Sequence, residues 1–471
     1  MRARACTLLA IALALTARPG LAQESQVRAD FRREGEHIAD SCGGFNPKAL
    51  FGCAYTLTTD YPLHVALGSL APQNGFAFGV AFSERYTPNE GWRLSWSGDA
   101  VAAPSGSWRG GLYMKIVRTP DLGVHVAAPG SVAAPGSVTA WERPVVDIFA
   151  QVVSLNTINF FGPGQASAED GRSVYGERQT IVGATGILPL SKLKALGGLR
   201  PALIAGVTGR FVTIRSGDSY GDPSIEQVYG EDAAPGLTEQ SPFVEFHEGL
   251  RFKPSVANGW LKFNYLLGAQ QFRTSGDTRS SFNRWTADLR HEIPLSRGSS
   301  SAGPRAFNGP NECAQLVGSP ACPPVSWSRN RQGTIGIRLF VSASTTSGGN
   351  QVPFYFQPTL GGSDLNGERL LASYQDYRFR GPNLLAWQAN VEHTLWGPIG
   401  VFLQGEQGKV AEDSGGLNFK GLNSSVTVGF TIRAGGFPMV NLSFSWGGEG
   451  NHVIGSMNST LLGGSTRPSL F

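Results

Sequence analysis

Apolar residues alternate with small or polar ones, residue by residue, through most of this chain of 471 residues. In the segment 75–83 every second residue is Phe or Val, and the residues between them are Ala, Gly or Ser. In the segment 284–293 an apolar face alternates with a charged face that carries Arg284, Asp288 and Arg290. Successive side chains of a strand point to opposite sides, so this period predicts strands with one apolar side.

Sixteen segments carry the pattern, and we predict a strand for each. They are 62–71, 75–86, 91–102, 106–118, 144–157, 175–188, 200–215, 242–255, 259–273, 282–293, 332–345, 384–396, 399–410, 424–433, 438–447 and 452–463. Many of them run 9–13 residues, which is the length that a tilted strand needs to cross about 30 Å of hydrocarbon.

A soluble sandwich is the alternative, because its strands also have one face in water and one in a core. The number of segments, the Gly/Ser/Pro/Asn-rich spacers and the lack of a long amphipathic helix after residue 40 favour a membrane barrel. We therefore predict an all-β fold, a sixteen-stranded antiparallel transmembrane β-barrel of the outer-membrane type.

Charge and hydropathy agree with this interpretation. Lys+Arg 39 against Asp+Glu 35 leaves a net charge of only +4, which argues against a nucleic-acid partner. Charged residues make up 16% of the chain, against a usual share of about 25%, yet the mean hydropathy is only −0.11. No stretch after the first two dozen residues reaches the ~18 apolar residues of a membrane helix.

The first residues predict export. Arg2 and Arg4 precede an apolar run over 6–17, and small residues at 20–22 fit a signal-peptidase site. We expect residues 1–22 to be a signal peptide, 23–60 a short periplasmic segment, and 61–471 the barrel.

Four cysteines remain after the signal peptide and form two close pairs, Cys42 with Cys53 and Cys313 with Cys322. In an oxidising compartment this spacing predicts two disulfides with short loops. A zinc site is the alternative, although no histidine lies near either pair in sequence. We expect no metal and no cofactor.

An even number of strands places both chain ends on the periplasmic side. Residues 159–174, 216–241 and 346–383 then become long outer loops. Two connections fit badly, because 119–143 and 294–331 are long and still fall on the periplasmic side.

The C-terminal third carries a distinctive series of motifs: Leu360-Gly361-Gly362, then 374–381 (YQDYRFRG), Asn390-Val391-Glu392 and 402–410 (FLQGEQGKV). It resembles the bacterial surface antigen family, the BamA/TamA-type outer-membrane assembly factors. That resemblance implies a sixteen-stranded barrel in which the Leu-Gly-Gly stretch enters a long loop folded back into the barrel, with five strands after the loop. Five predicted strands follow residue 383, and the chain ends in Phe471, an aromatic residue typical of such barrels.

The resemblance implies contacts between the infolded loop and the barrel wall. The residues concerned are Tyr374, Arg378, Phe379, Arg380, Gly381, Glu392 and Glu406. Where the family has an Arg-Gly pair in the loop, this chain has Ala372 and Ser373. We hypothesise that Arg378, Arg380 or Arg369 replaces the missing cation as the partner of Glu392 and Glu406. Alternatively, both glutamates face lumen water.

No metalloprotease, nucleophile-elbow or phosphate-loop motif occurs, so we expect no enzyme. The predicted function is insertion, assembly or translocation of proteins at the cell outer membrane, by a monomeric barrel that contacts outer-membrane lipid and unfolded outer-membrane or secreted clients. The roughly 40 residues between the predicted signal peptide and the first strand are too few for the family's periplasmic repeats. This favours the alternative, a passive plugged pore or structural surface antigen. A secreted soluble β-protein is a third possibility.

Overall fold

The computed structural model describes residue 36 and residues 63–89, 91–118, 143–190, 201–217, 221–256, 261–275, 278–295, 333–396, 399–434 and 437–457. The chain divides into two units, Met1–His64 and Val65–Phe471, and the strands lie in the second apart from the first two residues of β1. The signal peptide, the 23–60 segment, all four cysteines and the connections 119–142 and 296–332 lie outside the described residues.

Strands dominate the second unit. Their bounds are β1 (Leu63–Ser69), β2 (Phe76–Asn89), β3 (Trp92–Ala102), β4 (Trp108–Arg118), β5 (Val145–Phe160), β6 (Ser173–Pro189), β7 (Ala202–Ser216), β8 (Phe243–Phe252), β9 (Ser255–Val256), β10 (Leu261–Thr274), β11 (Phe282–Pro294), β12 (Gly333–Thr346), β13 (Thr359–Leu360), β14 (Phe379–Arg380), β15 (Asn383–Trp396), β16 (Ile399–Ala411), β17 (Asn423–Ala434), β18 (Phe437–Gly447) and β19 (Gly450–Met457). The short helices are η1 (Glu169–Gly171), α4 (Ile225–Val228), η4 (Thr278–Ser280), η6 (Phe354–Phe356) and η7 (Ser414–Gly416).

One antiparallel sheet holds all of these strands except β13 and β14, which form a small sheet of their own. Among the described residues the large sheet has 17 strands, but β8 and β9 both pair with β10 and together make one interrupted strand. The sheet therefore has sixteen strand positions, as the alternation predicted. Consecutive positions are neighbours, so the connections β5–β6, β7–β8, β12–β15 and β16–β17 all lie at one end of the sheet, called the loop end below.

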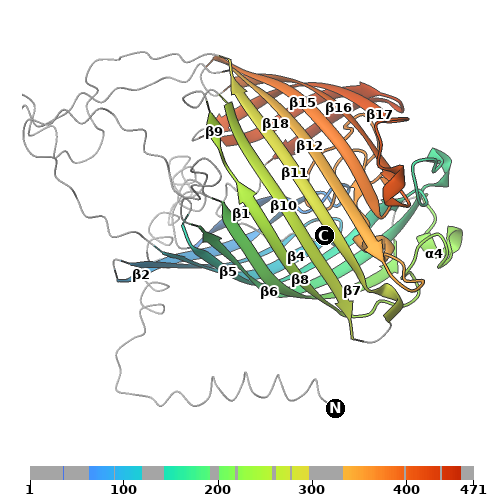
Figure 1. Cartoon of the computed structure of the whole chain (residues 1–471), viewed down its shortest axis with the longest axis horizontal. Coiled ribbons are helices and arrows are strands. Elements are labelled where there is room, and N and C mark those ends of the chain that lie inside the picture. The colour runs from blue at the N-terminus through green and yellow to red at the C-terminus, as the bar shows by residue number, and fades with distance from the viewer. Residues whose placement is uncertain are drawn as a thin grey trace, which may run out of the picture. The chain divides into compact units, whose positions relative to one another are not determined.

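The sheet curls around an interior, with strands on the near and far sides (Figure 1). The contacts of the β12–β15 connection, residues 347–382, also show that the sheet is curled. Its Phe354 ring lies 5.1 Å from Tyr175 on β6, and its Arg378 reaches Glu449 in the turn between β18 and β19. These strands are far apart in the sheet order, so one segment can touch them all only if the sheet wraps around it.

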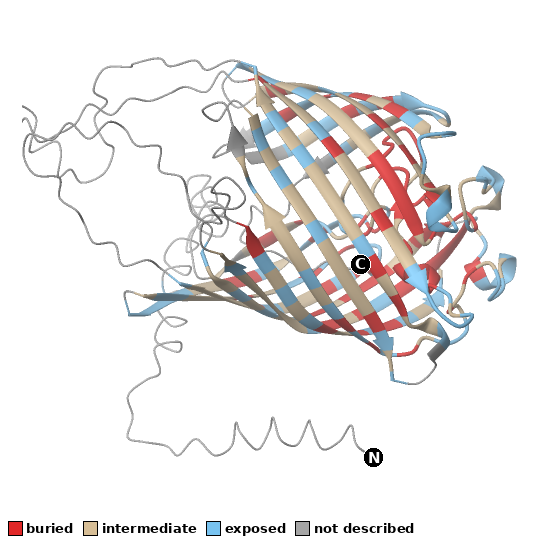
Figure 2. Cartoon of the chain, in the orientation of Figure 1, coloured by how far each residue is buried: buried red, intermediate tan, exposed pale blue. Residues whose placement is uncertain are grey.

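Outward faces are apolar and inward faces are polar. Exposed and less exposed residues alternate along the strands (Figure 2). Exposed apolar side chains include Phe78, Val80, Ile148, Val182, Phe211, Phe246, Trp285, Leu403, Phe430 and Leu442. Buried polar side chains on the alternate positions include Arg109, Gln151, Glu177, Gln179, Arg210, Glu245, Arg284, Arg338 and Glu406. This arrangement is the inverse of a soluble protein and corrects the sandwich alternative, which needs the apolar faces inside.

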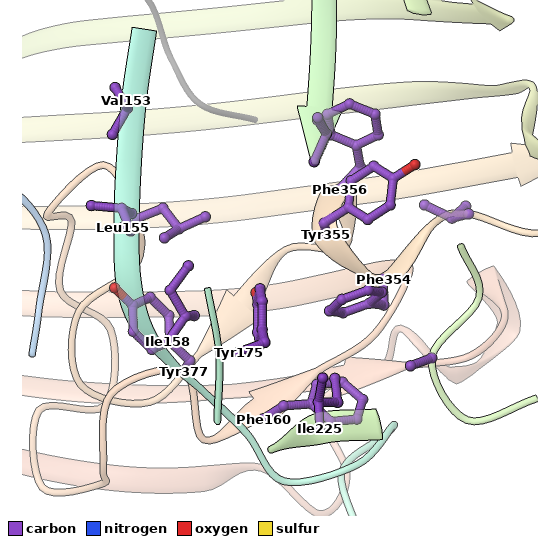
Figure 3. Close-up of a cluster of buried hydrophobic side chains, with 14 of the residues drawn as sticks. Val153, Leu155, Ile158, Phe160, Tyr175, Ile225, Phe354, Tyr355, Phe356 and Tyr377 are labelled. Atoms are coloured by element: carbon purple, nitrogen blue, oxygen red, sulfur yellow. The ribbon is translucent and has the colours of Figure 1, made fainter. Parts of the chain in front are cut away.

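The largest buried apolar cluster lies at the loop end, inside the sheet (Figure 3). Its centre is η6, whose Phe354 and Phe356 contact side chains from β5, β6, β8, β10 and β11. Phe356 lies 5.0 Å from Phe243 between ring centroids, in an edge-on arrangement that aromatic pairs favour. The lumen at this end is therefore packed rather than open.

Within the described ranges, no helix is long and apolar enough to cross a membrane. The same residues contain no group of three His, Cys, Asp or Glu side chains placed to hold a metal ion.

Candidate functional site

The candidate site is the returning segment 347–382 and the wall it touches. Gly361 and Gly362 bend the chain into the lumen with φ values of 106° and 60°, which other residues rarely adopt. A Cβ on Gly361 would lie 2.5 Å from Cβ of Arg378, and one on Gly362 would lie 2.7 Å from Cα of Asp376. The Leu-Gly-Gly stretch is thus required by the close approach of the outgoing and returning chains.

The returning chain is closed at its base by β13 and β14, in which Leu360 pairs with Phe379. Further along, Leu371 and Tyr377 have positive φ values of 58° and 63°. Residues other than glycine hold such a conformation only when their surroundings impose it, and both side chains are buried. The segment is therefore held in one shape by packing on the wall.

Arg380 is the largest fully buried side chain among the described residues. Its guanidinium donates to the carbonyl of Phe354 at 2.7 Å and to the hydroxyl of Tyr175 at 3.0 Å. The rings of Phe160, Tyr175 and Phe354 surround it at 5.7–5.8 Å. This cation–π cage fixes the end of the segment to β5 and β6.

Arg378 ties the segment both to the β18–β19 turn and to the β5–β6 connection. Its Nε donates to Glu449 at 2.6 Å, and its terminal nitrogens donate to the hydroxyl and carbonyl oxygens of Ser167 at 2.9 and 2.8 Å. The guanidinium also lies 4.6 Å from the ring centroid of Phe379, which itself packs against Tyr374. Sequence reasoning missed Glu449, because a lone acidic residue in a tight turn gives no signal.

Glu406 on β16 does contact the loop, but not through an arginine. It accepts from the backbone N–H of Ala372 at 2.9 Å and from the amides of Gln388 and Gln404 at 2.7 and 2.6 Å. Arg369 is the cation within electrostatic reach of Glu406, although it forms no ion pair with it. Uncharged donors thus take the place that the pairing hypothesis gave to a guanidinium.

The other predicted contact residues divide into two groups. Gly381 fits against Val410 on β16, where a Cβ would come within 3.2 Å of the Val410 side chain. Glu392 lies lower on β15 and contacts Thr431 on β17, at 3.4 Å from its hydroxyl. The structure therefore brings Tyr374, Phe379, Gly381 and Glu406 together around the segment, and it leaves Glu392 away from it.

A second charged cluster holds the tip of the segment, and the sequence text of the family did not indicate it. Arg338 on β12 bonds both oxygens of Asp288 on β11 at 2.8 and 2.9 Å. It also pairs with Glu368 of the segment, as does Arg290 at 3.3 Å. The charged face of 284–293 indicated the wall half of this cluster, but the sequence could not show that Glu368 of the loop would pair with its arginines.

Asp364, in the same tip, yields a pH prediction. Its carboxylate accepts the N–H groups of Asn366 and Glu368 at 2.9 and 2.8 Å, which favours the charged form, but burial outweighs these bonds and raises the pKa of the carboxyl to about 7. The usual pKa is near 3.9, so the folded state holds a proton that the unfolded state releases between about pH 4 and 7. Stability should therefore fall as pH rises through this window and level off above it.

We expect the urea midpoint of the folded protein to be higher at pH 5 than at pH 8, and this difference to shrink in Asp364→Asn. Asparagine keeps the acceptor oxygen but cannot ionise. Burial also raises the pKa of Asp376, so part of the slope should remain. An unchanged slope in the variant would assign the pH dependence to other groups.

Comparison with known proteins gives the following. No family model and no curated protein matches the chain. Similar solved structures include two CdiB proteins. CdiB from Escherichia coli has a TM-score of 0.48 and 11% sequence identity, and the match covers 82% of this chain and 58% of that chain. CdiB from Acinetobacter baumannii has a TM-score of 0.45 and 10% identity, with 83% of this chain and 56% of that chain covered. BamA from Haemophilus ducreyi lacking POTRA domains 1–3 is also similar, with a TM-score of 0.45, 10% identity, and a match over 84% of this chain and 69% of that chain. The chain thus spans less than two thirds of the length of either CdiB structure.

Proposed function

We propose that this chain is an outer-membrane β-barrel protein of the surface-antigen and assembly-factor type, which takes part in the insertion, assembly or translocation of other proteins. In this proposal residues 1–22 are a signal peptide, 23–60 lie in the periplasm, and the barrel contacts lipid as a monomer. The outward apolar faces support a lipid environment, since the inward positions are polar. Strands β2 to β8 have 10–17 residues, enough to cross the hydrocarbon.

The junction between the first and last strands carries the proposal of assembly activity. Within the described residues β1 has 7 residues and β19 has 8, and both pair with the same strand, β2, which has 14. Two strands that share one partner each pair with it over fewer residues than an interior strand does, so this junction should open more easily than the rest of the sheet. An extended client segment could pair with such an edge and add to the sheet.

Site-specific photocrosslinking in living cells tests this proposal. A photoreactive residue at Val453 on β19 should capture other outer-membrane barrel chains during their synthesis. The control position is Leu403 on β16, which is also an exposed apolar residue but lies on a strand that is paired along its length with β15 and β17. Equal capture at both positions, or unchanged levels of other barrels after depletion of this protein, would contradict the assembly role.

The second candidate is a passive plugged barrel. Arg378 fixes the segment 347–382 to the β18–β19 turn and Arg380 fixes it to β6, which favours a permanent plug. Client capture at Val453 distinguishes the two candidates, because a passive barrel offers no edge to a client strand.

A further inference from the structure

A cavity of about 420 Å³ lies in the lumen beneath the returning segment. Its wall comes from β5 to β8, β10 to β12 and β15, and its roof from residues 358–370. Cavities of this size hold small organic molecules in many proteins.

Most charges that line this cavity are already paired. Arg210 bonds Glu245 at 2.5 Å, and Arg338 bonds Asp288 and Glu368. Two lining carboxylates, Glu248 and Asp364, show no ion pair within the described residues; Glu248 is exposed, and Asp364 accepts two backbone N–H groups. The remaining unpaired charge is Arg284 on β11. Among the described residues it has no carboxylate within 4 Å, although its side chain is 3% exposed.

The hydrogen bonds of Arg284 leave one nitrogen free. Nη2 donates to the carbonyl of Phe356, and Nε makes a long contact of 3.4 Å with the hydroxyl of Ser344. Glu245 attracts the Arg284 guanidinium electrostatically without bonding it, because the two carboxylate oxygens of Glu245 already accept from Arg210 and from the amide of Gln270. A buried guanidinium without a counter-ion is costly, so an anion in the cavity would be stabilised there.

Two further polar atoms on the cavity wall lack partners within the part of the chain that the structure describes. The hydroxyl of Thr359 is buried without a hydrogen bond, and so is Nδ1 of His247, which lies 3.7 Å from Glu245. Natural proteins leave few such groups unsatisfied, and each can donate to a ligand oxygen.

The remaining lining is largely apolar. Leu266, Phe340, Leu370 and Leu384 face the same space. An inorganic anion would leave these side chains against empty volume, whereas a hydrocarbon group would contact them.

We propose that the lumen cavity binds a small organic carboxylate, with its charged group on Arg284 and Thr359 and its hydrocarbon part against the apolar lining. This inference stands apart from the proposed assembly role, because the site lies on lumen-facing wall positions rather than at the end strands.

Titration calorimetry on the purified full chain in a neutral maltoside detergent tests the proposal, with benzoate as the probe. Benzyl alcohol supplies the same ring without charge, and inorganic phosphate supplies charge without the ring. We expect benzoate to bind more tightly than either. Arg284→Gln should weaken benzoate binding about tenfold or more, because it removes a hydrogen bond to a charged group. Arg273→Gln, on the exposed end of neighbouring β10, should leave it unchanged.

Thr359→Val is a second variant that keeps the wall charges intact and should weaken benzoate binding severalfold; it serves if Arg284→Gln does not fold. The proposal is overturned if benzoate does not bind, if benzyl alcohol or phosphate binds equally well, or if the cavity variant that folds binds benzoate like the wild type.

Discussion

Replacing Arg380 by methionine is expected to lower the free energy of unfolding by about 3 kcal/mol. The variant loses two hydrogen bonds from a charged donor, at 2.7 and 3.0 Å, and leaves the Phe354 carbonyl and the Tyr175 hydroxyl without this partner. It also removes a cation from within reach of the buried Glu177. One term acts the other way, since Nε of Arg380 has no partner and methionine relieves that cost. The loss of two charged bonds outweighs the relief of one unsatisfied donor.

Urea titration of the protein in detergent, read by heat-modifiable gel mobility, measures this loss. The matched control is Arg273→Met, because Arg273 is also an arginine that donates to backbone carbonyls but is exposed at the loop end. Its expected effect is below about 1 kcal/mol. Equal midpoints for Arg380→Met and the wild type would mean that the aromatic cage contributes nothing to holding the segment.

Removing the infolded tip should open the barrel. Leu360 and Phe379 face each other in an antiparallel pair, so Asn-Gly can replace residues 361–378 and close a two-residue hairpin. The shortened chain loses the backbone N–H groups that donate to Glu406 on β16 and Ser425 on β17. It also loses the Arg378 side chain that pairs with Glu449 in the β18–β19 turn. A sixteen-stranded barrel leaves a water-filled channel when nothing fills it. The cluster around η6 stays in place and keeps part of the lumen filled, so conductance should rise severalfold.

Planar-bilayer recording tests this expectation. The control shortens the β16–β17 connection instead, with Asn-Gly in place of 413–421, a loop of the same end made of exposed and half-buried residues. That control should keep the conductance of the parent chain. A hairpin variant that folds, as judged by gel mobility, and conducts no better than the control would contradict the role of the segment as a plug.

The strand plan could be predicted closely from the sequence. All sixteen predicted segments correspond to strand positions, most of them within two or three residues at each end. The prediction worked because a strand between lipid and a wet lumen must alternate at every step, and a shift by one residue would reverse both faces. The long connections 119–143 and 294–331 follow correctly predicted strands, β4 and β11. Their position on the side of the short turns therefore does not result from a misplaced strand.

The partners of the loop arginines could not be predicted. Arg378 binds Glu449, 71 residues away in sequence, and Arg380 binds Tyr175, 205 residues away. The resemblance to the family predicted a cationic partner for Glu406, but its carboxylate accepts from one backbone N–H and two side-chain amides instead. Such pairings depend on which strands face each other across the lumen, and local sequence carries no record of that distance.

The sequence alone determined which residues face outward and which face inward, because burial on one side of a strand is enforced at every second residue. It also marked the bend at Gly361 and Gly362. Only the tertiary structure decided what fills the interior. The curled sheet brings β6, β11, β16 and the β18–β19 turn within reach of one loop. It also leaves Arg284 at the edge of a cavity with no carboxylate paired to it. The reason is physical: alternation is a local constraint, whereas charge pairing across a lumen depends on the three-dimensional closeness of strands that are far apart in sequence.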